Sequence, residues 1–183
     1  MRAFDDLVRQ GKVRYIGASN YHAWRLTRAL WESDRRAYVR YESIQPKYNL
    51  VFRDEYEREL EPLCLEQSIG VIPYSSLGSG FLSGKYHRGR DLPKTARAGN
   101  VQKTYMTDRG FTVLEAVEKV AAAAGATPAQ VALSWLAHRP GITAPIASAT
   151  SVAQLKELVG GIELQLDSDA RATLDRASAW QEA

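Results

Sequence analysis

Apolar and polar positions change period along the chain, from short β-prone runs to stretches with helical spacing. The β-prone runs predict four strands, at residues 13–18, 40–45, 70–74 and 142–147. The helical spacing predicts helices at residues 22–33, 54–68, 110–124, 128–138, 151–159 and 168–179. A further amphipathic helix opens the chain, and its predicted apolar face carries Ala3, Phe4, Leu7 and Val8. No capping residue precedes this helix, so we expect the polypeptide to begin upstream of it.

Several residues predict how these helices begin, bend or pack. Pro62 is expected to kink the 54–68 helix, because proline removes a backbone donor and clashes with the preceding turn. Thr127 is expected to cap the 128–138 helix, with Pro128 at its first position. Apolar residues lie all round that helix, so it should be well buried. Cys64 lies in a helical pattern and is interpreted as a small buried thiol rather than a nucleophile.

The alternation of strands and helices predicts the fold class. Strands separated by helices indicate βαβ units, a parallel sheet and right-handed crossovers. A closed TIM barrel needs eight strands over about 250 residues, and this sequence offers four. The sequence therefore predicts an α/β fold made of parallel βα units that form half of a TIM (β/α)8 barrel. We expect one domain over residues 1–183, with a long loop at 75–109 and an extra carboxyl-terminal helix.

Composition excludes some classes of partner and location. The chain has 183 residues, of which 45% are hydrophobic and 25% charged, as in ordinary globular proteins. Its net charge of +3 is too mild to argue for a nucleic acid or an anionic membrane as partner. The single cysteine excludes an internal disulfide. No apolar run approaches about 18 residues, and the first residues carry charges where a signal peptide is apolar, so a cytoplasmic location is expected.

Polar or aromatic side chains follow every predicted strand. In parallel α/β folds the carboxyl ends of the strands share one face, where ligands bind. The residues at these ends bear amide, hydroxyl or aromatic groups: Ser19 and Asn20, Gln45, Tyr74 to Ser76, and Ser148 to Ser151 followed by Gln154. This set suits a neutral amide and a planar ring better than a metal, whose usual ligands are His, Cys, Asp and Glu. We therefore expect no metal site.

Structural roles are an alternative for some of these residues. Helix capping alone would account for Ser19, Asn20 and Ser151, since each precedes a predicted helix. Packing of Tyr74 in the core is also open. Gln45 ends a strand before a proline and is not a preferred cap, so a ligand role explains it better.

Five ordered motifs resemble the aldo-keto reductases: GKVRYIGASNY, SIQPKYNL, GVIPYSSLGSGFLSGKY, TPAQVALSWLAHRPGITAPIASAT and QLKEL. The nearest likeness is to the branch of aryl-alcohol-type reductases and potassium-channel β subunits. The resemblance runs from residue 2 to about residue 175. It implies the carboxyl-terminal half of the family's domain, with the fifth to eighth strands of the barrel.

The resemblance also implies a cofactor site, for NADP or, less typically, NAD. Ser19, Asn20 and Gln45 match positions that hydrogen-bond the nicotinamide carboxamide, and Tyr74 matches the aromatic that stacks on its ring. The residues that match the pyrophosphate loop and its phosphate-contacting lysine are Ser75, Ser76, Leu77, Gly78, Ser79 and Lys85. The residues that match the adenosine segment are Ser148, Thr150, Gln154 and Glu157. That segment lacks the Arg or Lys of many relatives, so NAD stays open as cofactor. Leu158 stands where family members often have Asn, which removes a hydrogen bond to adenine. The basic loop 85–103 either folds over the dinucleotide or stays solvated.

The resemblance places the family's catalytic Tyr, Lys, Asp and His in an amino-terminal half that this chain lacks. Tyr21, His22 and Tyr48 are expected near the site face, but none has a Lys/Asp pair to tune it, so we assign no catalytic residue. The leading hypothesis is an oxidoreductase of aldo-keto reductase type, represented by its cofactor-binding half and inactive alone on small carbonyl substrates. The alternative is a non-catalytic dinucleotide-binding or partner subunit. Self-association through the edges 13–18 and 142–147 is a further hypothesis.

Overall fold

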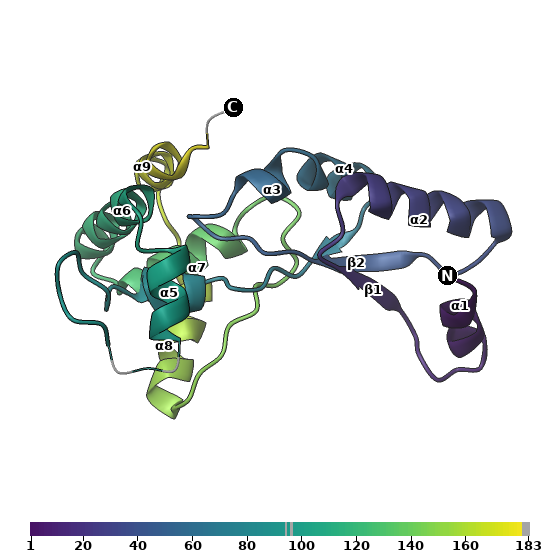
Figure 1. Ribbon diagram of the computed structural model, residues 1–183, viewed down its shortest axis with the longest axis horizontal. Coiled ribbons are helices and arrows are strands. Elements are labelled where there is room, and N and C mark those ends of the chain that lie inside the picture. The colour runs from purple at the N-terminus through teal and green to yellow at the C-terminus, as the bar shows by residue number, and fades with distance from the viewer. Residues whose placement is uncertain (94, 96, 181–183) are drawn as a thin grey trace.

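Three short parallel strands form the sheet: β1 (Ile16–Ser19), β2 (Tyr41–Gln45) and β3 (Gly70–Val71), in the order β1-β2-β3. The computed structural model describes residues 1–93, 95 and 97–180. Its helices are α1 (Arg2–Arg9), α2 (Ala23–Arg36), α3 (Asp54–Glu57), α4 (Leu60–Glu66), α5 (Ala98–Thr104), α6 (Asp108–Ala124), α7 (Pro128–Ala137), α8 (Val152–Glu163) and α9 (Ser168–Ser178), with a 3₁₀ helix η1 (Gly78–Ser83). The chain is elongated, with the sheet, α1 and α2 towards one end and α5 to α9 at the other (Figure 1). The predicted α/β class and parallel sheet are confirmed.

The register of the sheet aligns the carboxyl ends of its strands. Ser19 pairs with Gln45, and Ile44 pairs with Val71. On β1, Ile16 and Ala18 are buried, whereas the alternate residues are exposed. Because successive side chains of a strand point to opposite faces, β1 has one core face and one open face.

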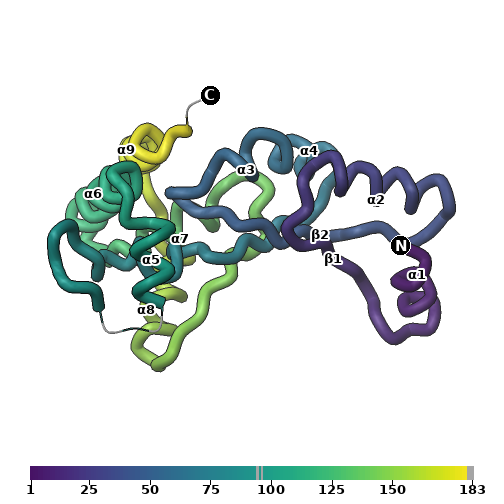
Figure 2. Tube along the Cα trace, in the orientation of Figure 1, coloured from purple at the N-terminus to yellow at the C-terminus, as the bar shows by residue number. Residues whose placement is uncertain are grey.

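The fourth predicted strand, at 142–147, does not form a regular strand among the described residues. Ile142 makes an isolated parallel bridge with Val71, and Ile146 donates its N–H to the Pro73 carbonyl at 2.8 Å. Pro145 has no N–H for a ladder, which limits regular pairing. The segment nevertheless runs alongside β3 and the residues after it. It then continues to α8, as the light-green trace in Figure 2 shows. The sheet therefore has three strands and one irregular neighbour.

The predicted 54–68 helix is divided into α3 and α4. The break lies at Arg58 and Glu59, and Pro62 occupies the first turn of α4. A proline ring clashes with the carbonyl four residues earlier, which here belongs to Arg58. In the first turn of a helix the missing N–H has no intrahelical partner to lose. The expected effect of Pro62 is confirmed, one turn upstream of the proline itself.

The apolar face predicted for the first helix is only partly buried: Leu7 and Val8 are half-buried, and Val8 packs against the core. Ala3 and Phe4 are exposed, and the buried residue of α1 is Asp5. Its carboxylate accepts a hydrogen bond from the Val39 N–H at 2.9 Å and pairs with Arg9 at 2.6 Å. A buried carboxylate is tolerated because both contacts offset its desolvation. In this region α1 is therefore attached to the chain before β2 by a polar contact.

Helices α6 and α7 form much of the core at the other end. Thr127 caps α7 by accepting from the Gln130 N–H at 3.2 Å, and Gln130 returns a contact to the Thr127 N–H, which completes a capping box. Val131, Trp135 and their neighbours on α7 are buried, as expected. Cys64 on α4 is also buried, and burial raises the pKa of its thiol to about 11, which confirms the interpretation as an inert thiol.

The long connection at 75–109 is more structured than predicted. It contains η1 and α5, and α6 begins within it at Asp108. Lys94 of the basic loop lies outside the described residues. Within the described ranges no single helix is long and apolar enough to cross a membrane; only α6 and α7 together reach that length and composition, and they meet at a bend of 99°.

Candidate functional site

The end of β1 is joined to the end of β2 by two hydrogen bonds. The Ser19 hydroxyl donates to the Gln45 carbonyl at 3.1 Å, and the Asn20 N–H donates to the same oxygen at 3.3 Å. Asn20 has a φ of 53°, a left-handed conformation that asparagine tolerates better than most residues. This turn directs the chain away from the sheet towards α2. The structure therefore brings Ser19, Asn20 and Gln45 together.

Parallel pairing continues beyond the ends of β2 and β3. The Tyr74 N–H donates to the Pro46 carbonyl at 3.0 Å, and Lys47 forms an isolated bridge with Tyr74. These contacts place Tyr74 beside the residues that follow Gln45. We call Ser19, Asn20, Gln45 and Tyr74, together with the loop 75–79, the strand-end site.

Asn49 fixes the loop that follows Tyr74, and sequence reasoning did not identify it. It is 1% exposed, and its Nδ2 donates to the Ser75 carbonyl at 2.9 Å. Its Oδ1 accepts from the N–H groups of Val51 and Phe52 at 2.9 and 3.1 Å. All three contacts are made to backbone, so Asn49 connects the turn after β2 to the loop after β3. The available signal in the sequence was its position, four residues after the strand-end Gln45.

The loop after Tyr74 is built from backbone conformations that few side chains favour. Ser75, Gly78, Ser79 and Gly80 all have positive φ, between 57° and 94°. A Cβ on Gly80 would meet only the end of the Lys85 side chain, with Nζ at 3.0 Å. The open side of this loop is therefore faced by a flexible cation. Such an arrangement of small residues lets a ligand approach the backbone closely.

Ser76, one of the residues predicted to contact the pyrophosphate, makes its hydroxyl contact within the protein. It is buried, and its hydroxyl donates to the Ile146 carbonyl at 2.7 Å. That contact links the loop after β3 to the segment that leads to Ser148. Ser76 therefore positions two parts of the site, and its hydroxyl faces protein.

The adenosine-side residues form a separate group at the start of α8. Thr150 donates its N–H and its hydroxyl to the Gln154 Oε1, at 2.8 and 2.9 Å. Ser151 caps the helix by accepting from the Gln154 N–H at 3.2 Å, so the capping alternative holds for Ser151. Ser148 is exposed, and Glu157 is partly buried. In the described part of the chain no hydrogen bond joins these side chains directly to those of the strand-end site.

Lys47 is a second cation near the strand ends. Its Nζ lies 3.3 Å from the centre of the Phe52 ring and 5.5 Å from that of Tyr105. Burial lowers the pKa of Lys47, and the carboxylate of Glu55 opposes that shift. The described residues contain no group of three or more His, Cys, Asp or Glu side chains able to hold a metal.

The two tyrosines expected near the site face lie in different surroundings. The Tyr48 hydroxyl donates to Glu57 Oε1 at 2.7 Å and accepts from Arg139 at 3.1 Å, and burial raises its pKa. The ring of Tyr21 packs edge-on against Tyr41, under the guanidinium of Arg25. A general acid near neutral pH needs a pKa moved towards that range. The pKa shift of Tyr48 is away from that range.

The sequence of this chain matches that of a known protein family. The family model described as Aldo/keto reductase family matches residues 1–179. This chain belongs to the aldo/keto reductase family. The family typically uses NADP(H).

Individual relatives cover nearly all of this chain. The Bacillus subtilis protein named Uncharacterized oxidoreductase YrpG is 32% identical over 167 residues, which are 91% of this chain and 49% of the relative. Aldo-keto reductase AFTS1 of Alternaria alternata is 30% identical over 177 residues, or 97% of this chain and 47% of the relative. Other relatives at 30 to 33% identity bear provisional names of potassium-channel β subunits or an aryl-alcohol dehydrogenase. The chain thus spans about half the length of the curated relatives it matches, 49% for the first of them.

A buried ion cluster lies outside the strand-end site in this aldo/keto reductase chain, and the sequence pattern did not reveal it. The cluster consists of Arg53, Glu57, Arg139 and Asp175, and the Tyr48 hydroxyl joins it. Glu57 Oε1 lies 2.8 Å from Arg53 and 3.4 Å from Arg139. Because its members are up to 122 residues apart in sequence, spacing alone could not bring them together.

Proposed function

We propose that this chain is the cofactor-holding part of a nicotinamide-dependent carbonyl reductase, arranged as half of a (β/α)8 barrel. The observation that supports this proposal is the backbone pairing at the strand-end site, which holds Ser19 and Asn20 beside Gln45 and holds Tyr74 beside Pro46 and Lys47. Asn20 and Gln45 offer the donors and acceptors that a carboxamide needs. Tyr74 offers a flat face at the same edge. In this proposal NADP(H) supplies the hydride chemistry when bound.

The loop 75–79 and Lys85 suit the anionic centre of a dinucleotide. The space above Gly80 is taken only by the flexible end of Lys85, so an incoming phosphate can displace it and then pair with its ammonium. Ser148, Thr150, Gln154 and Glu157 would receive the adenosine end. Their side chains are hydroxyls, an amide and a carboxylate, and none is the cation that would select a 2′-phosphate. We propose NADP as cofactor because the family typically uses it, and the lack of such a cation makes NAD a close competitor.

No residue of this chain is proposed as the proton donor to a carbonyl. The protein's own contribution in this proposal is to bind and orient the nicotinamide, because its contacting groups lie on strands held together by backbone pairing. Reduction of small aldehydes or ketones would need the remaining half of a family member. We expect the chain alone to show no turnover with NADPH and aromatic aldehydes.

The assignment of Gln45 to the nicotinamide can be tested by comparing two ligands. Replacing Gln45 with alanine should weaken NADPH binding about tenfold, because the carboxamide loses its hydrogen-bonding partner. Binding of 2′-phospho-ADP-ribose, which has no nicotinamide, should be unchanged. Isothermal titration calorimetry of both ligands gives the two dissociation constants.

Gln154→Ala is the matched control, since it also removes one glutamine amide but lies in the adenosine group. It should weaken both ligands to a similar degree. If Gln45→Ala weakens both ligands equally, or neither, the nicotinamide assignment is wrong.

A second candidate function is that of a partner subunit that self-associates. Helix α8 carries four exposed apolar residues on one side: Val152, Leu155, Val159 and Ile162. Their spacing of three, four and three residues is that of a helix-pairing seam. Two copies of this chain together have about the length of one curated relative, since each spans 49% of the first of them. We propose that these seams face each other in a symmetric dimer.

A charge placed in the seam should break this dimer. Val159→Glu should convert the dimer to a monomer, because a buried carboxylate without a partner opposes association. Sedimentation velocity measures the mass in solution. Ala153→Glu adds the same charge on the opposite side of α8 and should leave the dimer intact. A wild-type chain that stays monomeric at about 1 mM would refute self-association.

A further inference from the structure

The outward side of α2 carries two tryptophans that are mostly exposed. Trp24 is 62% exposed and Trp31 is 60% exposed. Arg28 and Arg35 follow at helical spacing, so that the four side chains form one line along the helix, which we call the α2 ridge. The Arg35 guanidinium lies 5.2 Å from the centre of the Trp31 ring. Large aromatic side chains dominate core and interface energetics, so two on one exposed helix face indicate a contact surface.

A groove of about 590 Å³ lies beside the ridge, between α2 and α4. The side chains that line it include Thr27, Leu30, Trp31, Tyr38, Leu63 and Gln67. Trp31 therefore belongs to both the ridge and the groove. A concave space of this size, apolar at Leu30 and Leu63, accommodates one or two large side chains of a partner.

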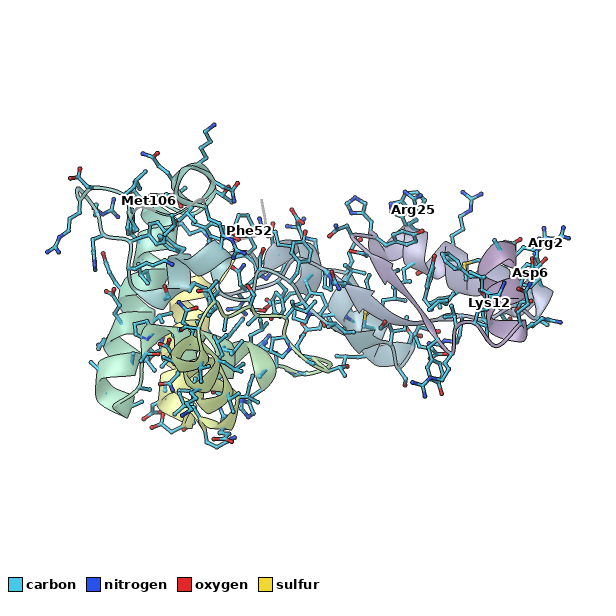
Figure 3. All side chains as sticks on the ribbon, turned by 90° about the horizontal axis from the view of Figure 1, so that it is seen from below. Arg2, Asp6, Lys12, Arg25, Phe52 and Met106 are labelled. Atoms are coloured by element: carbon cyan, nitrogen blue, oxygen red, sulfur yellow. The ribbon has the colours of Figure 1, made fainter. Side chains whose placement is uncertain are left out.

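Residues 21–40, which include α2, carry an excess of positive charge. They contain five arginines, one glutamate and one aspartate, a net charge of +3. The basic loop 85–103 is a second positive segment, in another part of the sequence. Figure 3 shows Arg25 of α2 in the same half of the molecule as Arg2 and Asp6 of α1.

We propose that the α2 ridge and its groove form a docking surface for an acidic segment of a partner protein that carries an aromatic side chain. The aromatic anchor would enter the groove beside Trp31, and carboxylates next to it would pair with Arg28 and Arg35. Tryptophan and arginine are the residue types that contribute most to binding at protein interfaces. Complementary charge would also increase the rate of association.

A protein partner fits this surface better than a nucleic acid. Asp34 lines the groove, and Glu32 forms ion pairs with Arg35 and Arg36 on the same helix. These carboxylates would repel a continuous phosphate backbone, whereas a peptide can present its charges at chosen positions. None of the residues of the ridge or groove belongs to the set proposed to hold the dinucleotide.

The proposal can be tested with a random copolymer of glutamate and tyrosine as probe. Fluorescence anisotropy of the labelled copolymer should report saturable binding to the full chain. Trp31→Ala and Arg28→Glu should each weaken this binding at least about tenfold, as expected for central interface residues. Arg171→Glu on α9 is the control, because it reverses one exposed charge elsewhere. Circular dichroism should show all three variants folded.

Polyglutamate without tyrosine and a thymidine oligonucleotide of similar length separate the competing explanations. Weaker binding of both supports the proposal. Equal binding of polyglutamate, or an equal effect of Arg171→Glu, would mean non-specific attraction and overturn it. Tighter binding of the oligonucleotide would identify a nucleic-acid surface instead. No binding of the copolymer at about 1 mM would also overturn the proposal.

Discussion

Replacing Glu57 with glutamine is expected to lower the free energy of unfolding by about 3 kcal/mol, because it removes one charge from a buried ion cluster. The Glu57 side chain is 7% exposed, and that of Arg53 is 9% exposed. Without the carboxylate, the acidic partner that Arg53 keeps among the described residues is Asp175, at 3.5 Å, and the Asp175 side chain is 40% exposed. Glu57 also accepts from Trp180 Nε1 at 3.0 Å, which attaches the segment after α9 to α3. The variant therefore leaves a buried guanidinium poorly compensated.

Urea unfolding followed by tryptophan fluorescence measures this loss. Glu59→Gln provides a matched control, since the same change is made on the exposed turn between α3 and α4. The control should change stability by less than about 0.5 kcal/mol. A loss for Glu57→Gln no larger than that of Glu59→Gln would contradict the role given to the cluster.

The same cluster predicts how stability changes with pH. Burial by itself would raise the pKa of Glu57, but hydrogen bonds from Arg53 and Tyr48 outweigh it and hold the pKa below its usual value. A group whose pKa is lower in the folded state contributes stability above its unfolded pKa, near 4.5. That contribution is lost as the pH falls from there through the folded pKa. Glu57→Gln should therefore show a smaller loss of stability on acidification than the unmodified chain.

Replacing Phe81 with alanine is expected to cost about 3 to 5 kcal/mol of stability, since it empties the centre of a buried aromatic cluster. Phe81 lies in η1 and is 0% exposed. Its ring centre is 5.9 Å from that of Tyr105 and 5.6 Å from that of Phe111. These contacts attach the loop after β3 to α5 and α6. The loop that we assign to the pyrophosphate should lose its support together with the core.

Thermal and urea unfolding measure the effect, and Phe4→Ala is the control. Phe4 is 42% exposed on α1, so its truncation removes a similar ring with little core contact. We expect a much smaller loss for Phe4→Ala, and an intermediate loss for Phe81→Leu. Equal losses for the two alanine variants would show that the aromatic cluster does not hold η1.

Local sequence signals predicted most helices because those signals act within a few residues. Thr127 and Pro128 specify the start of α7, and Pro62 specifies the break before α4. Gln45 and Tyr74 were singled out from the same kind of local pattern, at the ends of apolar runs. Their proximity followed from the rule that parallel strands end at one edge, and the hydrogen bonds after β2 and β3 agree with it.

Features that depend on distant partners could not be predicted in this way. Asp5 is buried because Val39 and Arg9 meet its carboxylate, and nothing in the spacing of α1 indicates the contact with Val39. The segment at 142–147 has strand-like composition, but it forms no regular strand among the described residues. Pro145 lacks an N–H for pairing, and the bridge that the segment makes is to β3, on one side of it. The cluster around Glu57 joins α3 to residues near the carboxyl end, so only the folded chain reveals it.

The central claim is that the ends of β1, β2 and β3, with the loop that follows, hold a nicotinamide dinucleotide. Calorimetric titration of NADPH into the unmodified chain and into Lys85→Ala, at the same low salt concentration, tests it most directly. We expect saturable binding with one site per chain, weakened about tenfold in Lys85→Ala because a charge-assisted contact to phosphate is lost. No heat of binding up to about 1 mM NADPH, or equal affinity for the two chains, would contradict the account.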